Sequence, residues 1–366
     1  MKIVFYSPYL PKHFGGGEKY FFDVALTYAQ KHQVFIALPA NIKKTDLEKI
    51  KSDYQDFLQR DLSTLNFIIS PFGANSKRLQ KIFWTSKFDV VYFVTDGSAF
   101  FSLARRSIMH IQVPLVLQRK NWWEKCKFRT FNIINSNSQF TKKVVEKYWG
   151  VKVNLVCQPG IDTAQFAPTV WKKEKIILNV GRFFDQLHCK NQVVLVEFFR
   201  ALLEKYPQEM QGWKLILIGK VESEAYVNQV RKLAAGLPIV ILTEVNHQDL
   251  IRYYQKAAIY WHATGFYDDP LKNPEKMEHF GISTVEAMAA GCVPVVIGKG
   301  GQTEILGHDL SYLSWITQAE CLKKTLQLIK NPKRLLEIGH QAQKRADKFN
   351  LKAFEKKCWQ QLEMKK

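Results

Sequence analysis

The stretch from Glu278 to Ile297, EHFGISTVEAMAAGCVPVVI, predicts a loop, a short helix, a glycine stop and a buried strand. Ser283 is a good N-cap residue, and Glu286 follows it at the spacing of a capping box. Gly291 can adopt the left-handed conformation that ends a helix, and residues 293–297 are typical of a strand buried on both faces. The small apolar residues between them suit a helix that packs against a sheet, so the stretch predicts an α/β fold.

The same stretch has the chemistry of a ligand site. A helix N-terminus beside a glycine presents free N–H groups and the positive end of the helix dipole, which suit a phosphate. Glu278 and Glu286 cannot hold a phosphate, but carboxylates accept hydrogen bonds from sugar hydroxyls. The stretch therefore favours a sugar nucleotide, and the simpler alternative is a capping box with a solvated loop acid.

Length and composition predict two soluble domains. The chain has 366 residues, of which 46% are hydrophobic and 23% are charged. The most apolar window, Val90 to Leu103, is interrupted by Asp96 and is too short to span a bilayer. The six cysteines form no CxxC pair, which is typical of reduced thiols and gives no metal or disulfide signal. We expect a cytoplasmic protein.

The chain has a net charge of +20, and one block of it is strongly basic. Eleven basic residues and two acids lie between Arg105 and Lys152, and tryptophans interrupt the basic segment Arg119–Arg129. Such a block suits nucleic acid, an anionic membrane surface or a phosphorylated acceptor, and it is also compatible with a merely basic surface. Because no zinc-finger spacing, RNP-like run or basic heptad pattern accompanies it, we expect no nucleic-acid partner.

Apolar runs and helical periodicity alternate in two successive halves. Strands are expected at 2–7, 34–38, 67–70, 90–94, 109–112, 133–136 and 154–157, and then at 175–180, 214–218, 239–242, 258–262 and 293–297. The segment from Pro159 to Pro168 has no periodicity and predicts the linker. Two parallel sheets in succession imply a cleft between two domains, with ligands at the carboxyl ends of the strands.

In the first half, two candidate sites follow or lie within strands. Gly15, Gly16 and Gly17 let the backbone approach a ligand closely at the start of a helix, although any strand-to-helix turn can use glycine. They do not form GxGxxG, and no acid ends the second strand, which counts against an NAD-dependent oxidoreductase. His110 lies in a strand among apolar residues, where a lone histidine is more often structural than functional.

In the second half, cations follow the strands. Gly181 and Arg182 come directly after one strand and Lys190 one loop later, a pair of cations that suits a diphosphate. Gly219 and Lys220 end the next strand, and residues 242–245, with Val245, could face a base with backbone groups; topology alone places these two sites. The sequence has neither Asp-x-Asp nor a histidine cluster at metal spacing, so we expect no metal.

At these residues the sequence resembles the GT-B glycosyltransferases, and among them the large retaining family 4, over nearly the whole chain. The matching motifs are Gly15–Glu18, Asn135–Ser136 with Phe140–Thr141, Gly181–Arg182 with Lys190–Asn191, and Glu278–Gly281 with Glu286–Gly291. Glu278 and Glu286 form the Glu-x7-Glu motif of that family. One departure is Cys189, which stands between His188 and Lys190 where many relatives run straight into the lysine.

The resemblance implies two Rossmann-like domains that face each other across a cleft. Residues 1–160, completed by a C-terminal helix within 349–366, would form the acceptor-side domain, and residues 161–348 would bind the nucleotide sugar. The residues expected to be catalytic are His110, Arg182, Lys190 and Glu278. Together with the residues placed by topology, the expected nucleotide-sugar contacts are Gly16, Gly17, Gly181, Gly219, Lys220, Val245, Phe280, Gly281, Ile282, Ser283 and Glu286.

By this resemblance the protein would move a hexose with retention from a nucleotide-diphosphate sugar to a glycan or polyprenyl-linked acceptor, without a metal or other cofactor. The leaving phosphate would help to take the proton of the acceptor in a same-face attack. The segment Arg119–Arg129 would dock on the anionic inner face of a membrane. The alternatives are a GT-B sugar-nucleotide epimerase or hydrolase and a basic nucleic-acid-binding protein.

Overall fold

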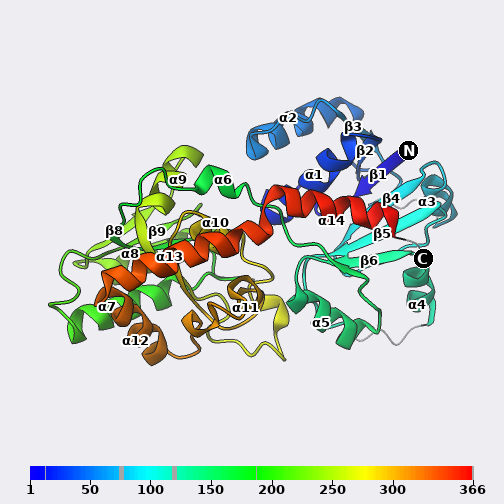
Figure 1. The fold of residues 1–366 in the computed structure, drawn as a ribbon. Coiled ribbons are helices and arrows are strands. Elements are labelled where there is room, and N and C mark those ends of the chain that lie inside the picture. The colour runs from blue at the N-terminus through cyan, green and yellow to red at the C-terminus, as the bar shows by residue number, and fades with distance from the viewer. Residues whose placement is uncertain (13, 74–77, 118–121, 187, 365–366) are drawn as a thin grey trace. The chain divides into compact units, whose positions relative to one another are not determined.

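The computed structural model describes residues 1–366 except 13, 74–77, 118–121, 187 and 365–366 (Figure 1). It divides into two units, one formed by Met1–Gly160 with Lys352–Lys366 and the other by Ile161–Leu351. Each unit is built on its own parallel sheet with helices packed against it. The predicted α/β class with two parallel-sheet domains is confirmed.

The first unit has a seven-stranded sheet in the order β3-β2-β1-β4-β5-β6-β7. Its strands are β1 Lys2–Tyr6, β2 Gln33–Leu38, β3 Leu65–Ile69, β4 Val90–Thr95, β5 Arg106–Ile111, β6 Ile133–Ser136 and β7 Leu155–Val156. Successive side chains of a strand point to opposite faces, so Ile3 and Phe5 join one core and Val4 and Tyr6 the other. Burial on both faces explains why these strands are continuous apolar runs.

Helices cover both faces of this sheet. One core receives side chains from α1 Gly16–Ala29, α2 Leu47–Leu58 and α14 Leu351–Glu363, and the other from α3 Arg78–Thr85, α4 Trp122–Arg129 and α5 Gln139–Trp149. The C-terminal helix α14, red in Figure 1, contributes Phe354 and Cys358 to the first core, and the Tyr28 hydroxyl of α1 donates to the Cys358 carbonyl at 2.9 Å. The end of the chain is therefore part of the first unit.

The second unit has a five-stranded sheet in the order β10-β9-β8-β11-β12. Its strands are β8 Glu174–Val180, β9 Lys214–Ile218, β10 Ile239–Leu242, β11 Ala257–His262 and β12 Val293–Val296. Its helices are α6 Thr163–Phe166, α7 Gln192–Lys205, α8 Glu224–Ala234, α9 His247–Lys256, α10 Ile282–Ala289, α11 Gln302–Leu306, α12 Gln318–Ile329 and α13 Pro332–Ala346. Four short 3₁₀ turns complete the described elements: Lys44–Asp46, Pro274–Lys276, Ser311–Leu313 and Asp347–Phe349.

The segment predicted as an aperiodic linker contains structure of its own. Residues Thr163–Phe166 form the single-turn helix α6, and the Asp162 side chain accepts from the Gln165 N–H at its start. Ile161 pairs with Asn350 in an isolated parallel bridge. The boundary between the two units, after Gly160, falls inside this segment, and one turn of helix is too short to produce a periodic pattern in the sequence.

Among the described residues, no helix combines the length and the apolar character needed to cross a bilayer.

Candidate functional site

The carboxyl ends of the strands in the second unit gather most of the predicted residues. Gly181 and Arg182 follow β8, Gly219 and Lys220 follow β9, and Val245 lies three residues beyond β10. The loop with Glu278 connects β11 to α10. Since all five strands are parallel, these segments meet at the same edge of the sheet.

Lys190, Glu278 and His262 form the centre of this edge. The Lys190 ammonium lies 2.5 Å from Glu278 Oε2, and the same oxygen lies 2.9 Å from His262 Nε2. Lys190 and Glu278 are each only 15% exposed, and His262 is fully buried. Because a carboxylate only accepts hydrogen bonds, His262 Nε2 carries the proton and donates it to Glu278.

Charge and burial fix the protonation of this cluster. Burial by itself would raise the pKa of Glu278, but the Lys190 ammonium and the hydrogen bond from His262 hold that pKa well below its usual range. Burial lowers the pKa of His262, although Glu278 opposes the shift. At neutral pH Glu278 is therefore an ionised carboxylate and His262 a neutral imidazole.

Two glycines make room for this arrangement. A Cβ atom on Gly181 would lie 2.6 Å from Lys190 Cγ, so the glycine lets the lysine stem pass over the end of β8. A Cβ atom on Gly219 would lie 1.9 Å from the Gly181 carbonyl oxygen, which no side chain tolerates. Gln192 Nε2 donates to the carbonyls of Gly181 and Arg182, both at 3.0 Å, and fixes the loop. The predicted glycines thus shape the lysine side of the site.

Arg182 has a different partner from Lys190. One of its guanidinium nitrogens, Nη1, lies 3.0 and 2.9 Å from the two carboxylate oxygens of Glu222, and the side chain is 43% exposed. Its guanidinium also lies over the Phe184 ring at 5.6 Å. The two predicted phosphate-binding cations therefore lie at the same edge of the sheet, and each is paired with a carboxylate.

The residue before helix α10 is Gly281, and the predicted capping box of Ser283 and Glu286 is absent. Gly281 is the N-cap residue with φ of +115°, so Ser283 lies inside the first turn. The Ser283 hydroxyl instead accepts from Tyr260 at 2.8 Å, and Glu286 Oε2 accepts from the Tyr254 hydroxyl at 2.9 Å. The prediction was wrong because a glycine at positive φ can start the helix without a side-chain cap.

This helix start keeps its anion-binding chemistry. Gly281 has no side chain to cap the helix, and the N–H groups of Ile282 and Ser283 have no acceptor within the first turn. A Cβ atom on Gly281 would lie 2.6 Å from Gln302 Nε2, so the position requires glycine for space as well as for conformation. Phe280 is 3% exposed and packs against Phe349, so only its backbone can face a ligand.

Two histidines flank the cluster and remain neutral. His188 and His279 pack edge to face with ring centroids 4.2 Å apart. Burial and the nearby Lys190 lower the pKa of His188 to about 4, and burial followed by His188 lowers the pKa of His279 well below its ordinary value. The Cys189 thiol, the predicted departure in this loop, accepts from the Asn191 N–H at 3.4 Å.

In the first unit, Gly16 and Gly17 begin α1 after β1, as predicted. Glu18 Oε2 accepts from the Gly15 N–H at 3.0 Å, and the Gly17 carbonyl accepts from Gln112 Nε2 at 3.1 Å. A Cβ atom on Gly17 would lie 2.5 Å from Gln112 Oε1. Gly17 thus lies close to the Gln112 side chain beyond the end of β5, and the contact of Gly16 and Gly17 with a ligand stays a prediction.

His110 is completely buried in the first sheet. Its ring stacks on Tyr20 at 4.1 Å, and its Nδ1 is bonded to Asn135 Oδ1. Burial lowers the pKa of His110 to about 3, although the Asn135 hydrogen bond opposes the shift. Its Nε2 is buried and has no hydrogen-bond partner among the described residues. The histidine is neutral at physiological pH, and its contact with a donor sugar stays a prediction.

Sequence reasoning missed several residues of the second unit. His262 ends β11 and could have been singled out by its strand-end position, as Gly181 was. Tyr254, Tyr260 and Glu222 meet their partners only through the tertiary fold, and no local pattern marks them. Within the described part of the chain, no three His, Cys, Asp or Glu side chains lie close enough together to hold a metal ion.

The two parallel-sheet units have the fold of the GT-B glycosyltransferases, and solved structures agree on this fold. The chain superimposes on Anabaena Alr3699/HepE, solved with UDP, with a TM-score of 0.72, 16% identity and coverage of 99% of this chain and 100% of that one. It matches a glycosyltransferase from Rickettsia africae with a TM-score of 0.71, 16% identity and coverage of 100% and 99%. The model of the family Glycosyl transferases group 1 matches residues 161–345, half of the chain, so the protein belongs to this family.

Relatives in sequence carry a more specific name. A Neurospora crassa GDP-Man:Man(3)GlcNAc(2)-PP-Dol alpha-1,2-mannosyltransferase is 25% identical over 270 residues, which are 63% of this chain and 45% of the relative. The enzyme of the same name from Xenopus tropicalis is 28% identical over 193 residues, 50% of this chain and 37% of the relative. The chain thus spans less than half the length of these relatives. The predicted GT-B fold and glycosyltransferase class are confirmed, and the assignment to a retaining family stays a prediction.

Proposed function

We propose that the protein transfers a hexose, with mannose as the first candidate, from a nucleotide-diphosphate sugar to a glycan or lipid-linked acceptor. The observation that carries this proposal is the cluster of Lys190, Glu278 and His262 beside the start of α10. Glu278 lies three residues before Gly281, the N-cap residue of that helix, which has no side-chain cap. A cation and free helix amides suit a diphosphate, and an ionised carboxylate suits sugar hydroxyls. The names of the sequence relatives support GDP-mannose and a lipid-diphosphate acceptor.

In the proposed reaction, Lys190 and Arg182 exchange their carboxylate partners for the phosphates of the donor. Glu278 keeps the hydrogen bond from His262 and accepts hydrogen bonds from the sugar. Glu286, oriented by Tyr254, accepts from the ribose hydroxyls. Stabilising the negative charge of the departing diphosphate is then the main catalytic contribution, and these residues can supply it without a metal. Attack of the acceptor on the same face would retain the anomeric configuration.

A transfer assay tests this proposal. The protein is incubated with GDP-mannose carrying a labelled sugar, with and without a polyprenyl-diphosphate oligosaccharide. We expect label in the lipid fraction only when both substrates are present, no effect of a chelator, and an α-anomeric product by NMR. Release of free sugar or interconversion of the donor without any acceptor would instead support the alternative, an epimerase or hydrolase.

The membrane contact proposed for Arg119–Arg129 rests on α4. Residues 118–121 lie outside the described part, and of the remainder Trp122 and Trp123 are each 61% exposed. Exposed tryptophans beside Lys125 and Arg129 suit the interface of an anionic bilayer. Weaker sedimentation of Trp122→Ala/Trp123→Ala than of the wild-type protein with anionic vesicles would support this contact, and equal sedimentation would exclude it.

A further inference from the structure

The first unit has a cavity at the edge of its sheet where the strands begin. Its volume is about 1030 Å³. Its lining residues open or directly precede four strands: Lys2 opens β1, Gln33 opens β2, Asp89 precedes β4 and Arg105 precedes β5. Gly16, by contrast, follows the end of β1 at the opposite edge. The cavity is therefore separate from the strand ends to which donor binding is assigned.

Positive charge dominates this cavity. The cations Lys2, Lys31, Lys87 and Arg105 line it, and the only acid among its lining residues is Asp89. The Asp89 carboxylate already accepts from the backbone N–H of Lys2 at 2.7 Å, where it ties β1 to β4. Across the described residues, none of the four cations has a carboxylate partner within ion-pair distance. The cavity therefore has a positive electrostatic potential that would attract an anion.

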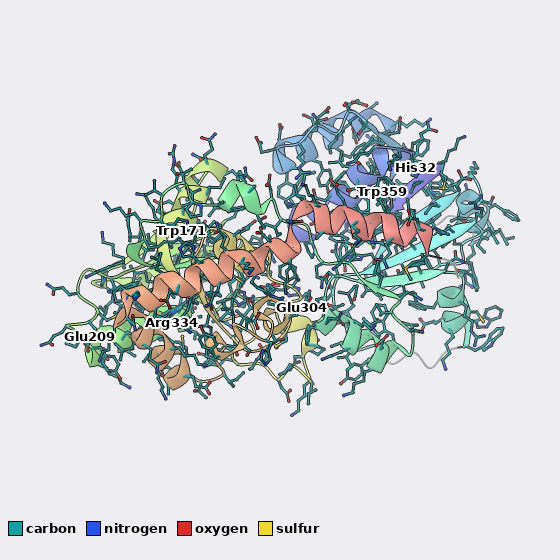
Figure 2. All side chains as sticks on the ribbon, in the orientation of Figure 1. His32, Trp171, Glu209, Glu304, Arg334 and Trp359 are labelled. Atoms are coloured by element: carbon teal, nitrogen blue, oxygen red, sulfur yellow. The ribbon has the colours of Figure 1, made fainter. Side chains whose placement is uncertain are left out.

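The side of the cavity near the C-terminal helix is ordered by aromatic contacts. The Lys31 ammonium lies 4.8 Å from the ring centroid of Trp359, and the His32 ring packs edge-on to the same tryptophan at 6.0 Å. Figure 2 shows His32 and Trp359 next to each other. Burial and the neighbouring positive charges, that of Lys31 included, lower the pKa of His32. At neutral pH this histidine can therefore donate one hydrogen bond without adding a charge.

Exposed apolar side chains lie on the rim of the cavity and on the helix α3, whose end is bonded to that rim. Leu103 lines the cavity and is 54% exposed. Its N–H donates to Thr85 Oγ1 at 2.9 Å, which joins the Leu103 loop to the end of α3. On the same helix Leu79 is 65% and Phe83 62% exposed. Apolar residues beside a group of cations are the combination that binds an anionic phospholipid surface.

We propose that this cavity binds a phosphate group, at a site separate from the one that receives the donor. Lysine and arginine make charge-assisted hydrogen bonds to phosphate oxygens, and Arg105 can do so with two nitrogens at once. The phosphate can belong to a lipid headgroup or to a soluble phosphate ester. The exposed Leu103 and α3 favour the lipid headgroup. The proposal does not depend on which sugar the protein transfers, or on whether it transfers one.

The test compares two double variants of the full chain. Lys87→Glu/Arg105→Glu reverses two cations of the cavity, whereas Lys43→Glu/Lys49→Glu reverses two exposed cations that neither line it nor belong to the basic block Arg105–Lys152. Each protein is sedimented with phosphatidylcholine vesicles with and without phosphatidate at low salt, and each is titrated with inorganic phosphate. We expect the wild-type protein and the control to bind alike and the cavity variant at least about tenfold more weakly.

The vesicle sedimentation and the titration with inorganic phosphate distinguish the two sources of the phosphate. A loss restricted to phosphatidate vesicles assigns the cavity to a lipid headgroup, and a loss of inorganic phosphate binding alone assigns it to a soluble ester; both support the proposal. Equal affinities of the cavity and control variants in both arms would overturn it. Tighter binding of a single-stranded oligonucleotide, lost only in the cavity variant, would replace it with a nucleic-acid surface. Circular dichroism checks the fold, and the milder Lys87→Gln/Arg105→Gln pair repeats the test if the first variant unfolds.

Discussion

The Lys190 ammonium and the Glu278 carboxylate, 88 positions apart in the chain, form an ion pair of 2.5 Å in which each side chain is 15% exposed. The same carboxylate oxygen also accepts from His262. Such a pair stabilises the fold only while both partners are present, because either charge alone is costly to bury. The pair is thus a structural element of the second unit and, in the proposed function, the cation and carboxylate that receive the donor.

Replacing Lys190 or Arg182 should distinguish a contribution to stability from a contribution to transfer. Lys190→Ala leaves the Glu278 carboxylate buried beside a neutral histidine, so we expect a loss of about 3–5 kcal/mol in the free energy of unfolding. We also expect transfer about a hundredfold slower. Arg182→Ala should slow transfer by a similar factor and cost less than about 1 kcal/mol of stability, because its pair with Glu222 is partly exposed. Urea unfolding and initial rates of transfer check both; unchanged rates would remove these residues from the mechanism.

The buried His110 predicts a dependence of stability on pH. Its pKa is about 3 in the folded protein and about 6.5 in the unfolded chain, so between these values only the unfolded chain binds the proton. The contribution to stability is complete above about pH 6.5 and falls by about 1.4 kcal/mol per pH unit below it. Urea unfolding of His110→Asn should show a shallower loss of stability than the wild-type protein on acidification. Parallel curves would contradict the neutral, buried state of the histidine.

Gly281 should be irreplaceable for conformation and for space. Gly281→Ala places a methyl group 2.6 Å from Gln302 Nε2 at φ of +115°, so we expect a loss above about 2 kcal/mol and weaker nucleotide binding. Gly150→Ala is the matched control, because Gly150 has φ of +64° and an added Cβ atom meets nothing within 4 Å. That control should lose only about 1–2 kcal/mol and keep its nucleotide affinity. Equal effects of the two substitutions in thermal melting would contradict a special role for Gly281.

The Tyr254 hydroxyl should matter for binding through Glu286. Tyr254→Phe removes a hydrogen bond to a carboxylate, and we expect about 1.5–3 kcal/mol less stability and about tenfold weaker nucleotide binding. Tyr28→Phe removes another buried tyrosine hydroxyl, whose acceptor is the Cys358 carbonyl in the first unit. It should cost about 1 kcal/mol and leave nucleotide affinity unchanged. If calorimetry finds the same affinity in both variants, Glu286 does not hold the ribose.

Regular elements with strong local patterns could be predicted from the sequence. The bounds predicted for β9 and β10 agree with Lys214–Ile218 and Ile239–Leu242. Here the apolar period and the flanking polar residues act locally, and the tertiary fold does not override them. The position of Gly181 directly after β8, and of Lys190 one loop later, followed from the predicted order of strands and helices.

Hydrogen-bond partners that only the tertiary fold brings together could not be predicted from local patterns. The Ser283 and Glu286 spacing gave a correct local signal for a helix start, but the two side chains bond Tyr260 and Tyr254 instead. A capping box and a tertiary hydrogen bond compete for the same oxygen atoms, and the sequence does not say which wins. The strand-end position of His262 could have marked it in the sequence, but its hydrogen bond to Glu278 is formed only in the tertiary fold.

The central claim is that the cation and carboxylate at the edge of the second sheet receive a nucleotide-diphosphate sugar. Thermal unfolding against a panel of UDP-, GDP-, ADP- and TDP-sugars tests it, with the wild-type protein, Lys190→Ala and the exposed control Lys143→Ala. We predict that one donor, at about a hundred times its dissociation constant, stabilises the wild-type protein and the control by about 2.7 kcal/mol and Lys190→Ala far less. Stabilisation by no member of the panel, or the same stabilisation of all three proteins, would contradict the claim.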